Sequence, residues 1–432
     1  MNESAAKEAI EKVLNLARAD DVFVRMGGSA FHSTRVADNL ITQNVARCNV
    51  SVRVDCAFGR QHGSAITNVF DDAALQAVVR RAAAIARVSP PDPEYMPPVP
   101  SEEAARYPEV ARSYDEQTAC CAPRWRAEQI VEATKPVEAK GFRLSGAYAT
   151  GSGFTALGNS AGLRAYHRST HAEMHCSVLG ANGSGWARQA SNDVAALDAS
   201  AIAGQALTIA EAAQCPADLE PGRYTVVLRP AAVFGLLGYL WSAFDAKATD
   251  EGRTFLRGKL GTRVCGRNIS IGSDPSDKRS PGRPFQSDGL ASQKLAWIRE
   301  GVLENLIYSR YWAARKKRAA TGRPANTLVA GGDSTVESLI RGVDRGILVT
   351  RFWYIRAVDP MRASITGMTR DGLFLIERGQ VAGPIRHMRF NERLFDLLGR
   401  VEQLGVPERV SLSAMVPAMR VREFNFTSAT RF

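Results

Sequence analysis

The sequence lacks any apolar run that approaches the ~18–20 residues a membrane-spanning helix needs. Its start, Met-Asn-Glu-Ser-Ala-Ala-Lys-Glu, is polar and helix-forming, and no apolar signal-peptide core follows it. These absences argue against a helical membrane protein and against a secreted one. We therefore expect a cytoplasmic protein that makes no membrane contact.

Cysteine and histidine are also sparse. The seven cysteines form no Cys-x-x-Cys pair, so we expect neither a zinc knuckle nor a disulfide framework. Of the six histidines only His387 follows residue 175, and no cysteine follows Cys265. The C-terminal half therefore cannot assemble a His-Glu-His-Cys ligand set by itself.

The chain has a moderate excess of basic residues. It carries 55 Lys and Arg against 44 Asp and Glu, which gives a net charge of +11 over 432 residues. Such a charge suits an acidic partner or a nucleic acid, and the one basic run is Arg315–Arg318. No pattern of a known nucleic-acid-binding module accompanies it. We expect a solvated helix end there and keep a basic nucleic-acid-binding protein as an alternative function.

The sequence divides into two parts near residues 215–222, and its overall pattern predicts an α+β fold. Residues 1–215 combine helical periodicity with alternating strands, which indicates an α/β domain of helices on mixed sheets. Within them, the proline-rich residues 89–100 predict an extended linker. Residues 216–432 contain mostly short strands and turns, which indicates a mainly antiparallel β domain, barrel-like or strongly curved.

The stretch Ile347–Val358 is rich in branched and aromatic residues and predicts a long strand. Arg351 and Arg356 interrupt its apolar pattern, and a charge within a strand needs an ion pair or an open groove. Arg351, Tyr354 and Arg356 are therefore our candidates to line a peptide groove. In a regular strand Arg351 and the pair Tyr354/Arg356 lie on opposite faces, unless a bulge intervenes. The alternative is buried ion pairs to carboxylates, for which the sequence offers Asp344, Asp359 and Glu377.

Two shorter patterns raise the question of ligand binding. Gly331-Gly332 before Asp333-Ser334 resembles a helix start, with Asp333 or Ser334 as the cap, and a phosphate is the ligand it would suit. It has no lysine of the kind that phosphate-binding loops use, so we expect a plain helix start.

The second pattern is His167-x-x-x-His171-x-x-x-His175. On a helix this spacing places three imidazoles on one face, where they form a plausible metal site with Glu173 as a base. On a strand the same imidazoles lie on one face but ~13 Å apart, which is too far to share an ion. The local sequence favours a strand, and a self-sufficient metal-dependent hydrolase using these histidines stays an alternative function.

Several segments together resemble the TldD/PmbA (TldE) metallopeptidase family. In the C-terminal half they are Gly346-Ile-Leu-Val-Thr-Arg-Phe-Trp-Tyr-Ile-Arg, Thr366-Gly-Met-Thr-Arg-Asp-Gly-Leu-Phe-Leu-Ile-Glu-Arg-Gly and Arg389-Phe-Asn-Glu. Earlier segments follow the same order, namely Gln43-Asn44, Arg87-Val-Ser-Pro-Pro-Asp-Pro and Tyr166-His167-Arg168. The resemblance covers nearly the whole chain.

The resemblance implies two types of subunit. TldD-type subunits are zinc peptidases with a His-Glu-x-x-x-His helix, whereas TldE/PmbA-type subunits lack these ligands and pair with a TldD-type subunit to degrade unfolded or leader peptides. Here the motif positions fall on Gly238, Tyr239 and Ala243, within an apolar helix expected from about Pro230 to Phe244.

Glycine and alanine side chains cannot bind zinc, so the resemblance implies a non-catalytic TldE/PmbA-like subunit without a cofactor of its own. Zinc is expected in a TldD-type partner. We expect this chain to form a heterodimer with that partner, with a homodimer possible in its absence. The expected substrate is an extended peptide.

Overall fold

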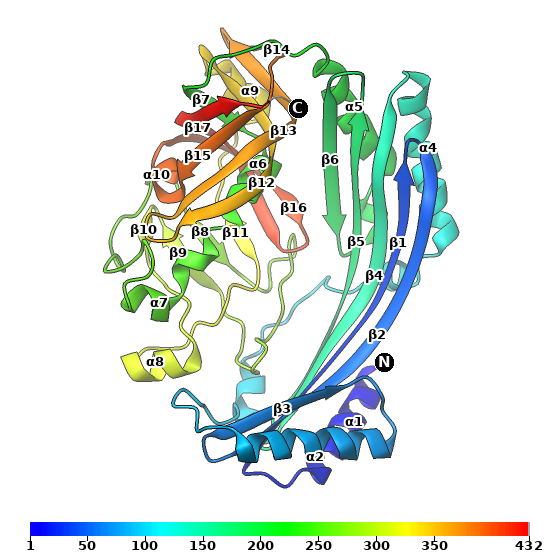
Figure 1. Cartoon of the computed structure of the whole chain (residues 1–432), viewed down its shortest axis with the longest axis vertical. Coiled ribbons are helices and arrows are strands. Elements are labelled where there is room, and N and C mark those ends of the chain that lie inside the picture. Colours follow the sequence, from blue (N-terminus) through cyan, green and yellow to red (C-terminus); the bar gives the residue numbers. More distant parts are fainter. Residues whose placement is uncertain (431–432) are drawn as a thin grey trace.

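The computed structural model describes residues 1–430 and divides this chain into two parts that lie side by side (Figure 1). The first part is built on a six-stranded sheet with the order β3-β2-β1-β4-β5-β6. Its strands are β1 (Asp21–Ala37), β2 (Leu40–Phe58), β3 (Gln61–Thr67), β4 (Arg143–Asn159), β5 (Arg164–Leu179) and β6 (Ser184–Ser191).

Every pairing in this first sheet is antiparallel, so the expected mixed sheet is wrong. For four of the five pairings the reason is the short connection between consecutive strands, whereas β1 and β4 are distant in the chain. Between β1 and β2 the chain reverses at Asp38 and Asn39, whose φ angles are 49° and 66°. Asp and Asn tolerate this left-handed backbone, and two such residues form the tight turn of a hairpin.

Helices cover one face of the first sheet. The helices of this part are α1 (Glu3–Leu16), α2 (Asp72–Val88), α3 (Glu116–Ala119), α4 (Pro123–Ala139) and α5 (Ala199–Ala212), with 3-10 turns at Ser101–Arg106 and Val194–Ala196. Helices α1 and α2 bury Val24 and Ala156, while α4 and α5 bury Tyr148 and Met174. The even-numbered residues of β4 and β5 therefore face helices, and the odd-numbered residues, among them His167, face the other way.

The second part contains a larger, mixed sheet of eleven strands. Its strands are β7 (Arg223–Leu228), β8 (Ile271–Ser273), β9 (Leu295–Arg299), β10 (Val302–Leu303), β11 (Thr327–Val329), β12 (Arg345–Asp359), β13 (Ser364–Glu377), β14 (Gln380–Pro384), β15 (Met388–Arg393), β16 (Val401–Ser411) and β17 (Ala414–Ala429). Its helices are α6 (Pro230–Leu237), α7 (Ala246–Asp250), α8 (Arg310–Lys316), α9 (Val336–Arg341) and α10 (Leu394–Gly399), with a 3-10 turn at Trp241–Phe244.

Five of these strands close a ring of hydrogen bonds, in the order β17-β15-β13-β12-β7 and back to β17. The ring is not a true barrel, because register shifts interrupt most of its pairings and further strands extend from it. The domain is also less antiparallel than expected, since β7–β12 and β11–β17 pair in parallel. Long connections separate the strands of both parallel pairs, and parallel pairing requires such connections.

Aromatic side chains from the ring fill the main core. Phe352 of β12 lies 4.7 Å from Phe390 of β15, measured between ring centroids, and Phe424 of β17 lies 4.9 Å from Phe426. Helix α6 packs on the same core through Val233. Among residues 1–430 no helix is both long and apolar enough to cross a membrane.

The two parts contact each other along β6 and through the segment that leads to α3. The Ser184 hydroxyl of β6 donates to Asp371 Oδ1 of β13 at 2.7 Å. The Tyr107 hydroxyl donates to the Gly289 carbonyl at 2.7 Å. Residues 89–100 form neither helix nor strand and lie at the start of this connecting segment. These side-chain contacts hold the first part against the second.

Candidate functional site

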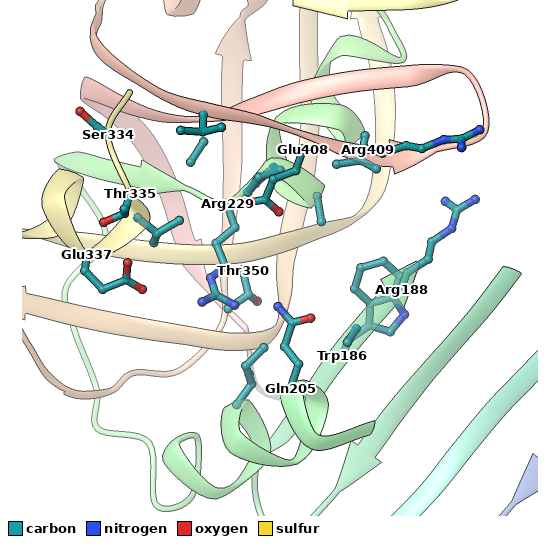
Figure 2. Close-up of a pocket in the computed structure, with 18 residues that line it drawn as sticks. Trp186, Arg188, Gln205, Arg229, Ser334, Thr335, Glu337, Thr350, Glu408 and Arg409 are labelled. Carbon is teal, nitrogen blue, oxygen red and sulfur yellow. The ribbon is translucent and has the colours of Figure 1, made fainter. Parts of the chain in front are cut away.

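A cavity of about 340 Å³ lies between the two parts of the chain (Figure 2). Strand β6 and helix α5 form one wall, and the second part forms the other. The polar and aromatic lining residues are Trp186, Arg188, Gln205, Arg229, Ser334, Thr335, Glu337, Thr350, Glu408 and Arg409. This volume falls within the range of pockets that bind small ligands, while the lining is more polar and charged than in most such pockets.

Arg229 lines the cavity from the junction of β7 and α6. It follows the last residue of β7 and caps α6, whose first residue, Pro230, fixes the turn from strand to helix. The backbone N–H of Arg229 donates to the Val349 carbonyl at 3.0 Å, which positions the side chain at the cavity. Within residues 1–430 its Nε is buried without a hydrogen-bond partner. An unpaired buried donor costs about 1–3 kcal/mol, so Arg229 is suited to bind an acceptor from outside the chain.

Two further arginines reach the cavity from opposite sides (Figure 2). Arg188 on β6 donates from Nη2 to Glu173 at 2.7 Å, while its Nε is buried and unpartnered in the described part of the chain. Arg409 on β16 donates from Nη2 to Asn192 Oδ1 at 2.6 Å, and burial lowers its pKa. The cavity thus collects three guanidinium groups from β6, the start of α6 and β16.

Two carboxylates lie among these cations. Partial burial raises the pKa of Glu408. The positive charge of Arg229 lowers this pKa, and the negative charge of the nearby Glu337 raises it further. The pKa of Glu337 is lowered, first by its own backbone N–H and then by the Thr335 hydroxyl, with Arg229 contributing. Glu337 is therefore the firmly ionised carboxylate, and Glu408 is the one more easily protonated.

The Gly331-Gly332 segment does precede a helix, but the cap is Thr335 rather than Asp333 or Ser334. The Thr335 hydroxyl accepts a hydrogen bond from the Ser338 N–H at 3.2 Å. This places Glu337 in the first turn of α9, facing the cavity.

The positions that the family resemblance assigns to a zinc motif lie at the end of α6. The expected helix to Phe244 is interrupted, because α6 ends at Leu237 and Gly238 is its C-cap. The Tyr239 hydroxyl donates to the Ile355 carbonyl, and Ala243 is buried in the 3-10 turn that follows. Across residues 1–430 no three His, Cys, Asp or Glu side chains are grouped to hold a metal ion. These residues do not fit a catalytic zinc, and we assign no step to one.

His167, His171 and His175 lie on strand β5, which confirms the predicted strand and excludes the alternative helical arrangement. They pair across to Thr155, Gly151 and Ala147 of β4 in an uninterrupted register. At ~3.3 Å per residue, successive imidazoles are ~13 Å apart along the strand. The structure therefore places them on one face without bringing them together around a common ion.

Each of these histidines has its own surroundings. His167 contacts Phe285 edge-on at 6.5 Å, and burial together with Arg283 lowers its pKa to about 4. His171 stacks on Phe31 with 5.9 Å between ring centroids, and burial lowers its pKa too. His167 and His171 line a second cavity between the two parts of the chain, of about 570 Å³.

Glu173 serves as an ion-pair partner on the same face of β5. Burial disfavours its charged form, but hydrogen bonds with His175 and Arg188 outweigh this and lower its pKa to about 2. The pair with Arg188 is 2.7 Å long, and that with His175 is 3.5 Å long. Glu173 thus orients Arg188, which lines the first cavity.

Replacing Glu173 with glutamine is expected to lower the free energy of unfolding by roughly 1–2 kcal/mol at neutral pH. A depressed carboxylate pKa stabilises the fold above the usual value near 4.5, and this contribution is lost as the pH falls toward about 2. Urea unfolding of both proteins between pH 7 and pH 3 measures the difference. Glu132→Gln, which breaks an exposed pair with Lys135, is the control. A difference that stays constant with pH would contradict the assignment.

A bulge decides which face the candidates on β12 occupy. Arg351 pairs across to Arg370 and Arg356 to Thr366, so a step of five residues along β12 matches a step of four along β13. The additional residue is accommodated at Tyr354, whose φ is 54°. Because Arg370 and Thr366 lie on one face of β13, Arg351 and Arg356 share a face of β12.

The Arg351 side chain makes its contacts within the protein. It forms an ion pair with Asp371 at 2.7 Å, and its guanidinium lies 4.6 Å from the centre of the Trp186 ring on β6. The side chain of Asp371 is only 3% exposed. The carboxylate partner is therefore Asp371, and not Asp344, Asp359 or Glu377. Arg351 joins the second part of the chain to β6 beside the first cavity.

Tyr354 and Arg356 lie on the surface, away from that cavity. The Arg356 guanidinium stacks 4.2 Å from the Tyr354 ring centre, and Arg370 stacks equally close to Trp353. Trp353 and Tyr354 are 43% and 57% exposed, so these aromatic rings are open to solvent. The three candidates of β12 thus occupy two different environments.

The basic run Arg315–Arg318 falls at the end of α8. Lys316 pairs with Asp250 at 3.1 Å, and Arg315 and Lys316 both lie over the Trp312 ring. Arg315 and Lys316 of the basic run are therefore engaged by neighbouring side chains.

Sequence reasoning missed the three arginines of the cavity and Glu408. Arg188 and Arg409 carry no local signal, because isolated charges are common on strands. Arg229 has a weak one, since it stands between an apolar strand and Pro230 at a helix start. Only the packing of β6 against β16 and β13 of the second part brings them together.

The chain is similar to metallopeptidase domains over most of its length. Residues 98–214 match the central domain of PmbA/TldA metallopeptidases, and residues 221–428 match their C-terminal domain. The structure superposes on TldE from Thermococcus kodakarensis with a TM-score of 0.87, covering 99% of each chain at 18% sequence identity. At this identity the superposition shows a shared fold.

Curated relatives match shorter segments. An uncharacterized protein from Methanocaldococcus jannaschii is 35% identical over 99 residues, which cover 22% of this chain and 24% of that protein. The metalloprotease PmbA of Escherichia coli O157:H7 is 23% identical over 217 residues, or 48% of this chain and 47% of that protein. The chain thus matches a quarter to a half of the length of these two relatives. Taken with the two matched domains and the shared fold, these similarities mean that the chain belongs to the PmbA/TldD metallopeptidase family.

Proposed function

We propose that this chain is a non-catalytic, TldE-like subunit of a heteromeric zinc metallopeptidase. In this proposal a TldD-type partner carries the zinc and the peptidase activity, and the complex acts on unfolded or leader peptides in the cytoplasm. The single observation that carries the proposal is the disagreement between family and residues. The family domains are present, yet Gly238, Tyr239 and Ala243 supply no zinc ligands.

The contribution of this chain is to hold an extended peptide next to the partner. Strand β6 is the edge strand of the first sheet, and its residues Trp186 and Arg188 line the cavity. An extended peptide binds such an edge through backbone hydrogen bonds, with side chains placed in neighbouring pockets. The arginines and Gln205 then act as donors to peptide carbonyl groups.

Peptidase activity is expected only when a TldD-type partner is present. The chain is purified alone and with that partner, and zinc content and cleavage of an unstructured peptide are measured. We expect zinc and cleavage in the complex but neither in the isolated chain, because its motif positions cannot hold the metal. Size-exclusion chromatography with light scattering shows whether the isolated chain forms a homodimer.

Two variants complete this experiment. A partner without its zinc-binding histidines should abolish cleavage by the complex, whereas His167→Ala in this chain should leave cleavage nearly unchanged. Zinc-dependent cleavage by the isolated chain, lost in His167→Ala, would overturn the proposal and support the self-sufficient hydrolase instead.

A further inference from the structure

We propose that the cavity between the two parts binds a carboxylate group of a peptide, with Arg229 as the residue that pairs with it. This inference rests on the proposed peptide-binding function and adds the chemistry of the group that is recognised. It is independent of zinc and of any partner, because every residue involved belongs to this chain.

The Arg229 side chain has hydrogen-bonding capacity that the described part of the chain does not use. A guanidinium has five N–H donors in a fixed plane, and this geometry matches the two oxygens of a carboxylate. Within residues 1–430 the Arg229 side chain makes no ion pair, although Glu337 and Glu408 lie close enough to be influenced by its charge. A bound carboxylate can supply the acceptors that the folded chain does not.

The start of α6 adds to the attraction. Arg229 caps this eight-residue helix without a side-chain hydrogen bond, and Pro230 and Ala231 of its first turn line the cavity. Pro230 has no N–H, and the Ala232 N–H donates to the Arg229 carbonyl. The Ala231 N–H and the helix dipole are therefore what favour an anion here. Arg229 and the helix start therefore present positive charge to the same space.

The opposite wall can hold the chain that carries the carboxylate. Trp186 offers an apolar ring, while Gln205 and the unpartnered Nε of Arg188 offer hydrogen bonds (Figure 2). Peptide carbonyl groups are acceptors of the kind these donors need. A carboxylate on Arg229 and a short stretch of backbone along β6 fit one extended ligand.

The two carboxylates of the cavity allow a test of whether the ligand is an anion or a cation. Glu408 and Glu337 repel a second carboxylate but attract a cation. Replacing Glu408 with glutamine removes one of these charges at nearly constant shape. The substitution must therefore strengthen binding of an anionic ligand and weaken binding of a cationic one.

A peptide carboxylate has two sources, the C-terminus and an Asp or Glu side chain. Three probes separate them, all N-acetylated alanine-based pentapeptides. The first has a free C-terminus, the second is amidated, and the third is amidated with one internal glutamate. Binding of each to the full-length isolated chain is measured by isothermal titration calorimetry.

We expect the first or third probe, or both, to bind at least about tenfold more tightly than the amidated peptide. Arg229→Gln should reduce this preference to about one, because it removes the charged donor. Glu408→Gln should strengthen carboxylate binding by about two- to fivefold. Arg124→Gln is the control, since Arg124 is 89% exposed on α4 and pairs with Glu128 on the same helix. Thermal unfolding verifies that each variant is folded.

Equal binding of the three probes, or weaker carboxylate binding in Glu408→Gln, would overturn the inference. If Arg229→Gln fails to fold, the comparison of probes and the Glu408 variant still decide the question. The proposed function is tested separately by partner-dependent cleavage. Loss of carboxylate preference with retained cleavage would reject only the further inference.

Discussion

Replacing Arg351 with methionine is expected to lower the free energy of unfolding by about 3–5 kcal/mol. The substitution keeps an apolar stem but removes the close partner of Asp371, whose side chain is only 3% exposed, and leaves Arg370 as a cation 3.9 Å away. A buried carboxylate without its counter-ion retains the cost of desolvation and loses the compensating attraction. The stacking of the guanidinium on Trp186 is lost as well. Urea unfolding followed by tryptophan fluorescence measures the change.

A double-mutant cycle separates the charge from the packing. Asp371→Asn in the Arg351→Met background removes the uncompensated charge, so the double variant should be less destabilised than the sum of the two single variants. The single Asp371→Asn variant also weakens the contact with the Ser184 hydroxyl, and this loss is common to both arms of the cycle. If Arg351→Met unfolds at the same urea concentration as the unsubstituted protein, neither the ion pair with Asp371 nor the stacking on Trp186 contributes to stability.

The second large effect is expected at Gly185 on β6. A side chain there would collide with the backbone of α5, reaching the Ala206 carbonyl oxygen and lying 2.6 Å from the Ala210 nitrogen. Because backbone cannot move aside cheaply, Gly185→Val should cost about 3 kcal/mol, at the upper end of overpacking effects. Thermal and urea unfolding of the full chain measure it.

The matched control lies on the same helix. A methyl group at Gly204 of α5 meets no atom within 4 Å. Gly204→Ala should therefore raise the free energy of unfolding by about 0.5–1 kcal/mol, because alanine favours the helix and restricts the unfolded chain. Equal effects of Gly185→Val and Gly204→Ala would show that α5 does not press on β6. Displacement of α5 would also move Gln205 and alter the cavity.

Comparison of these positions shows where local sequence is informative. Arginines within an apolar strand indicated that Arg351 needs a partner, and the structure places it in an ion pair. The identity of the partner was not predictable, because Asp371 reaches Arg351 only through a register shift between β12 and β13. Such shifts depend on contacts between strands, and these leave no periodic signal in either strand alone.

Residue types and local periodicity were enough to predict the α+β composition and the strand that carries His167, His171 and His175, whereas only the family resemblance assigned Gly238 and Ala243 to zinc-motif positions. The first two features are properties of single segments, so the segments' own sequence predicts them. Three other features emerged only from the folded chain: the first sheet is antiparallel, five strands of the second part close a ring, and Arg229, Arg188 and Glu408 share one cavity. Those features depend on which distant segments pack together, and packing is selected by the free energy of the whole chain.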